Sequence, residues 1–159
     1  MRALAEELRA EGQVALHVSL GASRQTPSLA DVEPRWVQAI GDAADIDLPA
    51  ADQPPARPSV APAVGTQLGQ LPRRWAMALH PVPTVRMLDE VDTIEGEAMV
   101  SFLAQLRSGF PRRPRAFPSS IVPVGLRDLE DCLVQAKGCS PRAVCRPTRA
   151  APSTSRPSP

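Results

Sequence analysis

Residues Thr84 to Ser108 read TVRMLDEVDTIEGEAMVSFLAQLRS, and this stretch decides the fold. Its first part is a short β-prone run that closes with two acids, Asp89 and Glu90. From Glu95 to Ser108, apolar side chains recur at helical spacing and define one face. These are Ala98, Met99, Phe102, Leu103 and Leu106. We therefore expect a strand followed by an amphipathic helix, which is the repeating unit of a parallel α/β sheet.

The rest of the chain continues this alternation of strands and helices. Glycine-bounded or β-prone runs predict strands, and apolar residues three or four apart predict helices. Pro34 fits a helix only in its first turn, and Pro72 should kink or shorten the helix that contains it. We expect helices at Met1–Ala10, Asp31–Ala44, Thr66–Leu79 and Leu126–Lys137, and strands at Val14–Leu20 and Ile121–Val124.

Proline content marks the parts of the chain that we expect to be least ordered. The 159 residues include 19 prolines and only 3% aromatic residues, so the ordered core should be smaller than the length suggests. Residues 48–64 have the composition of a proline-rich linker, and residues 138–159 have no periodicity and few large apolar side chains. We therefore expect one α/β domain within residues 1–137 and a disordered tail.

Net charge and hydropathy restrict the classes of partner. The formal net charge is +1, which gives no general electrostatic reason to expect nucleic acid. We interpret Arg112, Arg113 and Arg115 as a solvated loop in preference to a nucleic-acid contact. No apolar run is long enough to span a bilayer, and the N-terminus does not resemble a signal peptide, so we expect no membrane partner and a cytoplasmic location.

Histidine and cysteine residues give weaker signals. His17 lies inside an expected buried strand, where a satisfied core histidine is a more frequent finding than a catalytic one. Cys132, Cys139 and Cys145 form an odd set whose spacings fit neither paired CxxC motifs nor a zinc site. We interpret them as unpaired thiols.

Asp89 and Glu90 are the residues with the clearest chemical signal. An apolar strand that ends in two acids places their carboxylates at the carboxyl edge of the sheet, where open parallel sheets bind ligands. Acids at strand ends are common, so the pair alone does not identify a function. The surrounding segment is more specific.

The segment from Leu88 to Asp131, LDEVDTIEGEAMVSFLAQLRSGFPRRPRAFPSSIVPVGLRDLED, resembles a family of bacterial AAA-type P-loop ATPases. In that family an LDEID-like strand precedes a helix ending QLR, a GYPRRP loop, and a strand leading into GLRD. The segments before Leu88 resemble the family more loosely, so the likeness covers about residues 1–137. It implies an incomplete three-layer P-loop ATPase domain with a short parallel sheet.

The resemblance assigns roles to individual positions. Asp89 matches the acid that binds Mg²⁺, and Glu90 matches the catalytic base that polarises the attacking water. Arg127 and Asp128 match the strand end at which such enzymes contact the γ-phosphate of ATP. A surface ion pair beside a helix start is an equally good interpretation of Arg127 and Asp128. Asp92 is more simply structural.

One essential element of the family is missing from the sequence. No GxxxxGK motif followed by Ser or Thr occurs, and the single lysine, Lys137, lies in no glycine-rich loop. We therefore expect weak or no binding of ATP and Mg²⁺, and no hydrolysis by this chain alone. The leading interpretation is a fragment of a AAA-type ATPase. The alternative is a non-enzymatic interaction module that binds a protein partner or a second copy of itself.

Other departures from the family pattern point to the same conclusion. Arg86 stands where the family has an apolar strand residue, and Pro123 interrupts the strand before Gly125. In the tail, codons for Arg149 to Pro159 read two nucleotides out of frame can spell GSPFNIKAES, which contains the segment GSPFNIK expected after GLRD. We therefore infer a frameshift between Lys137 and Arg149, within the expected disordered tail 138–159.

The family arrangement also predicts the strand order. Without the strand that feeds the phosphate-binding loop, the strand ending at Asp89 should lie in the middle of the sheet, parallel to both neighbours. The strand Ile121–Val124 should then form an edge. An edge position would make Pro123 tolerable, because its missing N–H can face away from any partner.

Overall fold

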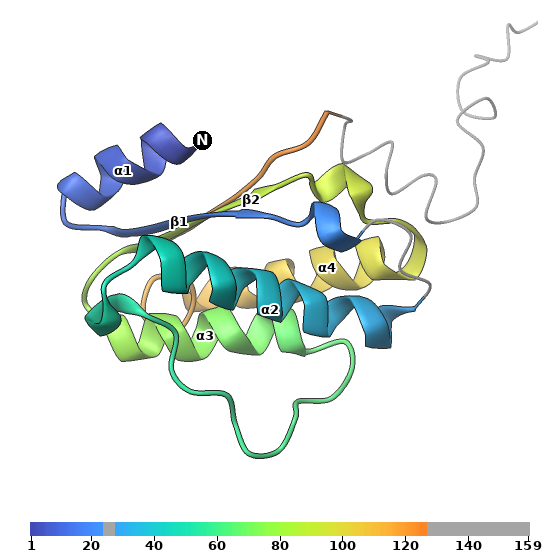
Figure 1. Ribbon diagram of the computed structural model, residues 1–159. Helices are drawn as coiled ribbons and strands as arrows, with labels where there is room; N and C mark the ends of the chain where they lie inside the picture. The colour runs from blue at the N-terminus through green and yellow to red at the C-terminus, as the bar shows by residue number, and fades with distance from the viewer. Residues whose placement is uncertain (24–27, 127–159) are drawn as a thin grey trace, which may run out of the picture.

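The computed structural model describes residues 1–23 and 28–126, and in that part of the chain one or two α-helices separate each strand from the next. The strands β1 (Val14–Ser19), β2 (Thr84–Asp89) and β3 (Ser120–Pro123) form one parallel sheet in the order β1-β2-β3 (Figure 1). The α-helices are α1 (Arg2–Ala10), α2 (Leu29–Asp47), α3 (Gln67–Leu79) and α4 (Gly96–Gly109). Short 3₁₀ turns are η1 (Gly21–Ser23), η2 (Ala50–Asp52), η3 (Val91–Thr93) and η4 (Phe110–Arg112).

The sheet contains the three strands expected from the sequence, in the expected order. β2 lies in the middle and pairs in parallel with both neighbours, with Ser19 opposite Asp89 and Pro123 opposite Leu88. Among the described residues β3 pairs only with β2, so Pro123 lies on an edge strand as predicted. After Pro123 the chain stays attached to β2, because the Val124 amide donates to the Leu88 carbonyl at 2.7 Å.

Helices cover the two faces of the sheet unequally. Helices α2, α3 and α4 pack on one face, around Leu16, Val18 and Leu88, and bury Trp36 and Phe102 completely. The Trp36 and Phe102 rings meet edge to face, with centroids 5.7 Å apart. On the other face α1 is the one described helix that packs against the sheet, in a small second cluster formed by Ala5, Leu8, Ala15, Val85, Met87 and Val122. The described chain is therefore mixed α/β with helices on both faces.

Helix α2 begins earlier than its apolar spacing predicts. Ser28 is the N-cap, and its Oγ accepts from the Asp31 amide at 3.3 Å. The helix then starts at Leu29, so Pro34 lies in its second turn, and the expectation that Pro34 occupies the first turn is wrong. The missing N–H of Pro34 leaves only the carbonyl of Ala30 without its helical donor, and Ala30 is exposed to water.

Of the two effects expected of Pro72 on helix α3, shortening is wrong, and a kink stays a prediction. Pro72 is buried in the second turn, yet the helix continues to Leu79 and is not shortened. Because Pro72 lacks an N–H, the first-turn carbonyl of Leu68 loses its helical donor, and the loss is limited to this one hydrogen bond. Trp75 and Ala76, which follow the proline, are buried against the core.

The proline-rich segment 48–64 follows a defined course beside α2 and α3. Three side chains fix it: Trp75 Nε1 donates to the Asp52 carbonyl at 2.8 Å, Arg74 Nη2 donates to the Ala56 carbonyl at 2.9 Å, and Arg57 Nη2 donates to Gln38 Oε1 at 2.8 Å. Apart from η2 it forms no regular structure, as a linker should. Its poor order stays a prediction, which amide hydrogen exchange would measure.

Several sequence predictions lie outside the described residues. These are the helix Leu126–Lys137 beyond its first residue, Arg127 and Asp128, the three cysteines, and the tail 138–159. Within residues 1–23 and 28–126, no helix is both long enough and apolar enough to cross a membrane.

Among the strand residues that the structure describes, Arg86 is the one charged side chain that is buried. It is 3% exposed, and its guanidinium lies 3.7 Å from the centre of the Trp75 ring. Nη1 donates to the carbonyls of Val14 and Val85, both at 3.0 Å, while Nε and Nη2 have no hydrogen-bond partner. Burial lowers the pKa of Arg86 to about 9. The arginine is therefore accommodated by the ring and two carbonyls, without a carboxylate.

We predict that Arg86→Met raises the free energy of unfolding at pH 7 by about 1–3 kcal/mol, since it removes a buried charge that lacks a counter-ion. Chemical denaturation would measure the change. The matched control is Arg107→Met, an exposed arginine on α4, which should change stability by less than about 0.5 kcal/mol. A marked loss of stability in Arg86→Met would show that the ring and carbonyl contacts outweigh the desolvation.

The same variant should show a pH dependence of known sign. The pKa of Arg86 is lower in the folded chain, about 9, than in the unfolded chain, so between these two pKa values the unfolded chain binds more protons. Below about pH 9, Arg86 is charged in the folded chain, and its buried charge lowers the free energy of unfolding. As the pH rises above about 9, the folded chain loses this proton and the free energy of unfolding increases. The advantage of Arg86→Met over the parent chain should shrink between pH 7 and about pH 10.5. A constant advantage would contradict the lowered pKa.

Candidate functional site

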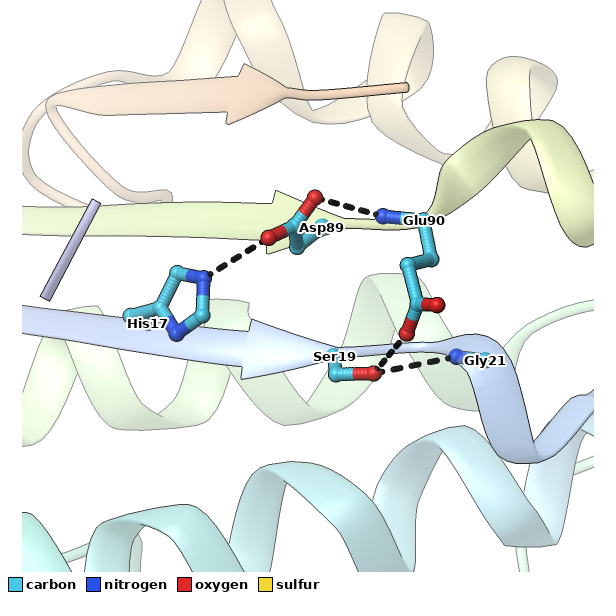
Figure 2. A network of polar contacts seen from close by, with 5 residues as sticks. All are labelled: His17, Ser19, Gly21, Asp89 and Glu90. Carbon is cyan, nitrogen blue, oxygen red and sulfur yellow. Dashed lines mark hydrogen bonds and ion pairs between the residues drawn. The ribbon is translucent and has the colours of Figure 1, made fainter. Parts of the chain in front are cut away.

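The candidate site lies where β1 and β2 end side by side. Parallel register places Ser19 opposite Asp89, and each strand then turns away from the sheet at the same edge. Figure 2 shows five residues at this edge: His17, Ser19 and Gly21 from the β1 side, and Asp89 and Glu90 from the β2 side. The sheet thus brings together residues more than seventy positions apart in the sequence, as the His17–Asp89 and Ser19–Glu90 contacts illustrate.

Both oxygens of the Asp89 carboxylate are engaged. Oδ2 lies 3.1 Å from His17 Nε2, and Oδ1 accepts from the Glu90 amide at 2.9 Å (Figure 2). The His17 side chain is 14% exposed and that of Asp89 is 34% exposed. His17 is therefore a satisfied and largely buried histidine, as expected, but its partner is the candidate metal-binding acid. When protonated, His17 forms an ion pair with Asp89.

Glu90 adopts an unusual backbone conformation. Its φ of 58° and ψ of 31° lie in the left-handed region, and Glu90 is the sole non-glycine residue with positive φ in the described chain. Two contacts fix the turn: Thr93 Oγ1 donates to the Glu90 carbonyl at 2.7 Å, and the Leu20 amide donates to the Asp89 carbonyl at 2.9 Å. Such a conformation costs on the order of 1 kcal/mol and occurs preferentially at functional sites.

This turn directs the Glu90 side chain back across the strand end toward β1. Its carboxylate accepts from the Ser19 hydroxyl, and the Gly21 amide donates to the same Ser19 oxygen at 3.3 Å (Figure 2). Gly21 leaves the room for this arrangement, because a Cβ at that position would overlap the Glu90 carboxylate. Asp92 lies on the other side of the turn, where a Cβ on Gly125 would come within 2.9 Å of its Oδ1.

The structure brings together some of the site residues expected from the sequence and adds others. Asp89 and Glu90 lie at the carboxyl edge of the middle strand, as predicted, whereas Arg127 and Asp128 are outside the described residues. Ser19 was not expected to take part. The signal that could have found it is the register of two parallel strands, which aligns the last residue of Val14–Ser19 with Asp89.

The described residues do not by themselves fit Mg²⁺ and ATP. Residues 1–23 and 28–126 contain no group of three or more His, Cys, Asp or Glu side chains arranged to hold a metal ion. The sequence offers no glycine-rich loop with a lysine to hold a triphosphate. Mg²⁺ usually binds one or two protein carboxylates together with substrate phosphates, so the carboxylates Asp89 and Glu90 supply only part of such a site.

Comparisons with protein-family models, with curated proteins and with solved structures find no match to this chain. The likeness to AAA-type ATPases therefore rests on the sequence segments quoted above.

The strained turn gives a prediction that is independent of function. Neither Glu90→Asn nor Glu90→Val retains the carboxylate that contacts Ser19, but asparagine tolerates the left-handed region and a β-branched valine does not. We expect Glu90→Asn to be more stable than Glu90→Val by about 1–2 kcal/mol in chemical denaturation. Equal stabilities would show that residue 90 leaves the left-handed region without cost.

Proposed function

We propose that this chain is part of a AAA-type P-loop ATPase domain, that it keeps the acidic Walker B strand end, and that it does not hydrolyse ATP alone. One observation carries the proposal. The apolar middle strand of a parallel sheet ends in Asp89, and Glu90 follows it directly at the carboxyl edge. Ligands of open parallel sheets bind at this edge, and P-loop ATPases place their metal-binding and catalytic acids there.

The proposed roles follow from the family pattern. Asp89 would bind the metal, Glu90 would act on the attacking water, and Arg127 and Asp128 would contact the γ-phosphate. His17 and the Glu90 amide bond to Asp89, and Ser19 bonds to Glu90, so protein groups engage both carboxylates. Without a loop to hold a triphosphate, these acids have no reacting group to act on.

We predict that the purified chain shows no ATP turnover in Mg²⁺ buffer, because catalysis of phosphoryl transfer depends on holding the triphosphate in place. A phosphate-release assay would measure it, with Glu90→Gln as the matched control. Any residual rate that is the same in both proteins comes from a contaminant. Robust hydrolysis by the parent chain that Glu90→Gln abolishes would contradict the proposed inactivity.

The parentage can be tested separately from activity. Sequencing the genomic DNA on both sides of this reading frame would reveal whether a GxxxxGK motif is encoded upstream in any frame. Its presence would support descent from a P-loop ATPase. Intact flanking sequence without such a motif would argue against the family assignment, whatever the assay shows.

A second candidate function is a non-enzymatic interaction module. It is favoured by the edge strand β3, which pairs only with β2 among the described residues. It is also favoured by the exposed apolar side chains of Leu4 on α1 and of Met1, the N-cap of that helix. Exposed strand edges and apolar helix faces are common places for a protein partner to bind. Specific Mg-ATP binding in a calorimetric titration, weakened in Asp89→Asn, would favour an ATPase-derived site over the interaction module. Absence of binding agrees with both candidates, and the upstream genomic sequence then separates them.

A further inference from the structure

Charged residues are strongly segregated along this chain. No Asp or Glu occurs between Gln53 and Leu88 or between Ala98 and Leu126, and every charged residue in these two stretches is an arginine. The acids of the described chain lie instead in residues 1–52 and 89–97. The net charge of +1 is therefore the sum of positive and negative stretches of the sequence. The acid-free stretches include α3, β2 as far as Leu88, most of α4, the loop that follows α4, and β3.

A cavity of about 250 Å³ opens between α3 and α4 within this positive region. No acidic residue lines it. Its lining includes Arg73 and Gln70 from α3, Ser108 from α4, and Arg112 from η4. It is distinct from the Asp89 and Glu90 site, since no residue of that site lines it.

Small residues and a buried polar network shape the cavity. Gly69 and Gly109 lie in its wall, and a side chain on Gly109 would overlap the Phe117 ring. Gln105 fixes the wall, because its Oε1 accepts from the Gly69 amide at 2.9 Å and its Nε2 donates to Glu33 at 2.6 Å. Glu33 is fully buried and does not line the cavity. Hydrogen bonds of Gln105 therefore hold one wall of the cavity in place.

Two arginines from different elements line the cavity, and each has guanidinium N–H groups that donate no hydrogen bond to a described residue. Arg73 and Arg112 are exposed, and neither forms an ion pair with a described residue. Arg112 Nη1 donates to the Ser108 carbonyl at 2.5 Å, which holds the guanidinium beside the cavity while its other N–H groups remain available. Thr66, Gln70 and Ser108 add neutral polar groups to the lining.

We propose that this cavity binds a phosphate group, with Arg73 and Arg112 as the charged donors. Guanidinium groups match phosphate oxygens bidentately, and two of them facing one site suit an anion that carries more than one negative charge. The volume is below that of most sites for drug-sized ligands, so the ligand in the cavity is small. A phosphate group has two sources, a free phosphate compound or a nucleic-acid backbone.

Isothermal titration of the full chain with inorganic pyrophosphate at low salt tests the site. We expect saturable binding that weakens about tenfold or more in Arg73→Gln and in Arg112→Gln, because each removes a charge-assisted hydrogen-bonding group. Arg107→Gln is the matched control, since Arg107 is an exposed arginine of α4 that does not line the cavity. Its affinity should stay within about twofold of the parent chain.

Circular dichroism of each variant checks that the chain remains folded. With folded proteins, absence of pyrophosphate binding would overturn the proposal. Equal weakening by all three variants would also overturn it, because it would indicate diffuse attraction to the positive region. Weaker pyrophosphate binding in Arg73→Gln and Arg112→Gln, with unchanged binding in Arg107→Gln, supports a defined site.

Two further ligands identify the phosphate source and its selectivity. An oligothymidylate of about twelve nucleotides that binds at least tenfold more tightly than pyrophosphate, with the same dependence on Arg73 and Arg112, would assign the site to a nucleic-acid backbone. If pyrophosphate binds as tightly as the oligothymidylate, or within about tenfold of it, the site is assigned to a free phosphate compound. Tricarballylate is the control for charge alone, and binding as tight as that of pyrophosphate would overturn selectivity for phosphate.

Discussion

The parallel pairing of β1 with β2 is the constraint on which the rest of the described structure depends. It buries Leu16, Val18 and Leu88 against three helices, and it fixes which residues meet at the carboxyl edge. A shift of one residue in this register would exchange the two faces of a strand. Leu16 and Val18 would then leave the main core, and Ser19 would no longer lie opposite Asp89. Fold and site are therefore set by the same set of hydrogen bonds.

The sequence predicts the local elements well because their signals are local. Apolar spacing identifies α1, α3 and α4, and the β-prone runs identify all three strands of the sheet. The start of α2 was placed too late, because the capping side chain of Ser28 marks it rather than an apolar residue. Proline has a smaller effect on helix length than the sequence rules predict, because Pro34 lies in the second turn of α2 and Pro72 does not shorten α3. In α3 the loss of one early hydrogen bond is local, and burial of Trp75 and Ala76 stabilises the helix beyond it.

The candidate site was only partly predictable for a different reason. Asp89 and Glu90 are neighbours in the sequence, so the pattern of one strand is enough to find them. The contacts of His17 with Asp89 and of Ser19 with Glu90 join distant segments, and they require knowledge of strand pairing and register. The left-handed conformation of Glu90 had no sequence signal at all, because glutamate does not favour it. The accommodation of Arg86 by Trp75 likewise depends on how α3 packs on β2.

Acidic and arginine-rich stretches alternate along the sequence, so residues 1–23 and 28–126 carry charges of both signs in separate segments. The sequence pI is about 7.8, so near neutral pH little overall repulsion keeps two copies apart. Arginine-rich segments of one copy can then attract acidic segments of another. Dissolved salt screens such attraction over about 10 Å at 0.1 M ionic strength. Added salt should therefore increase the solubility of this protein near neutral pH, the opposite of what a uniformly charged surface would show.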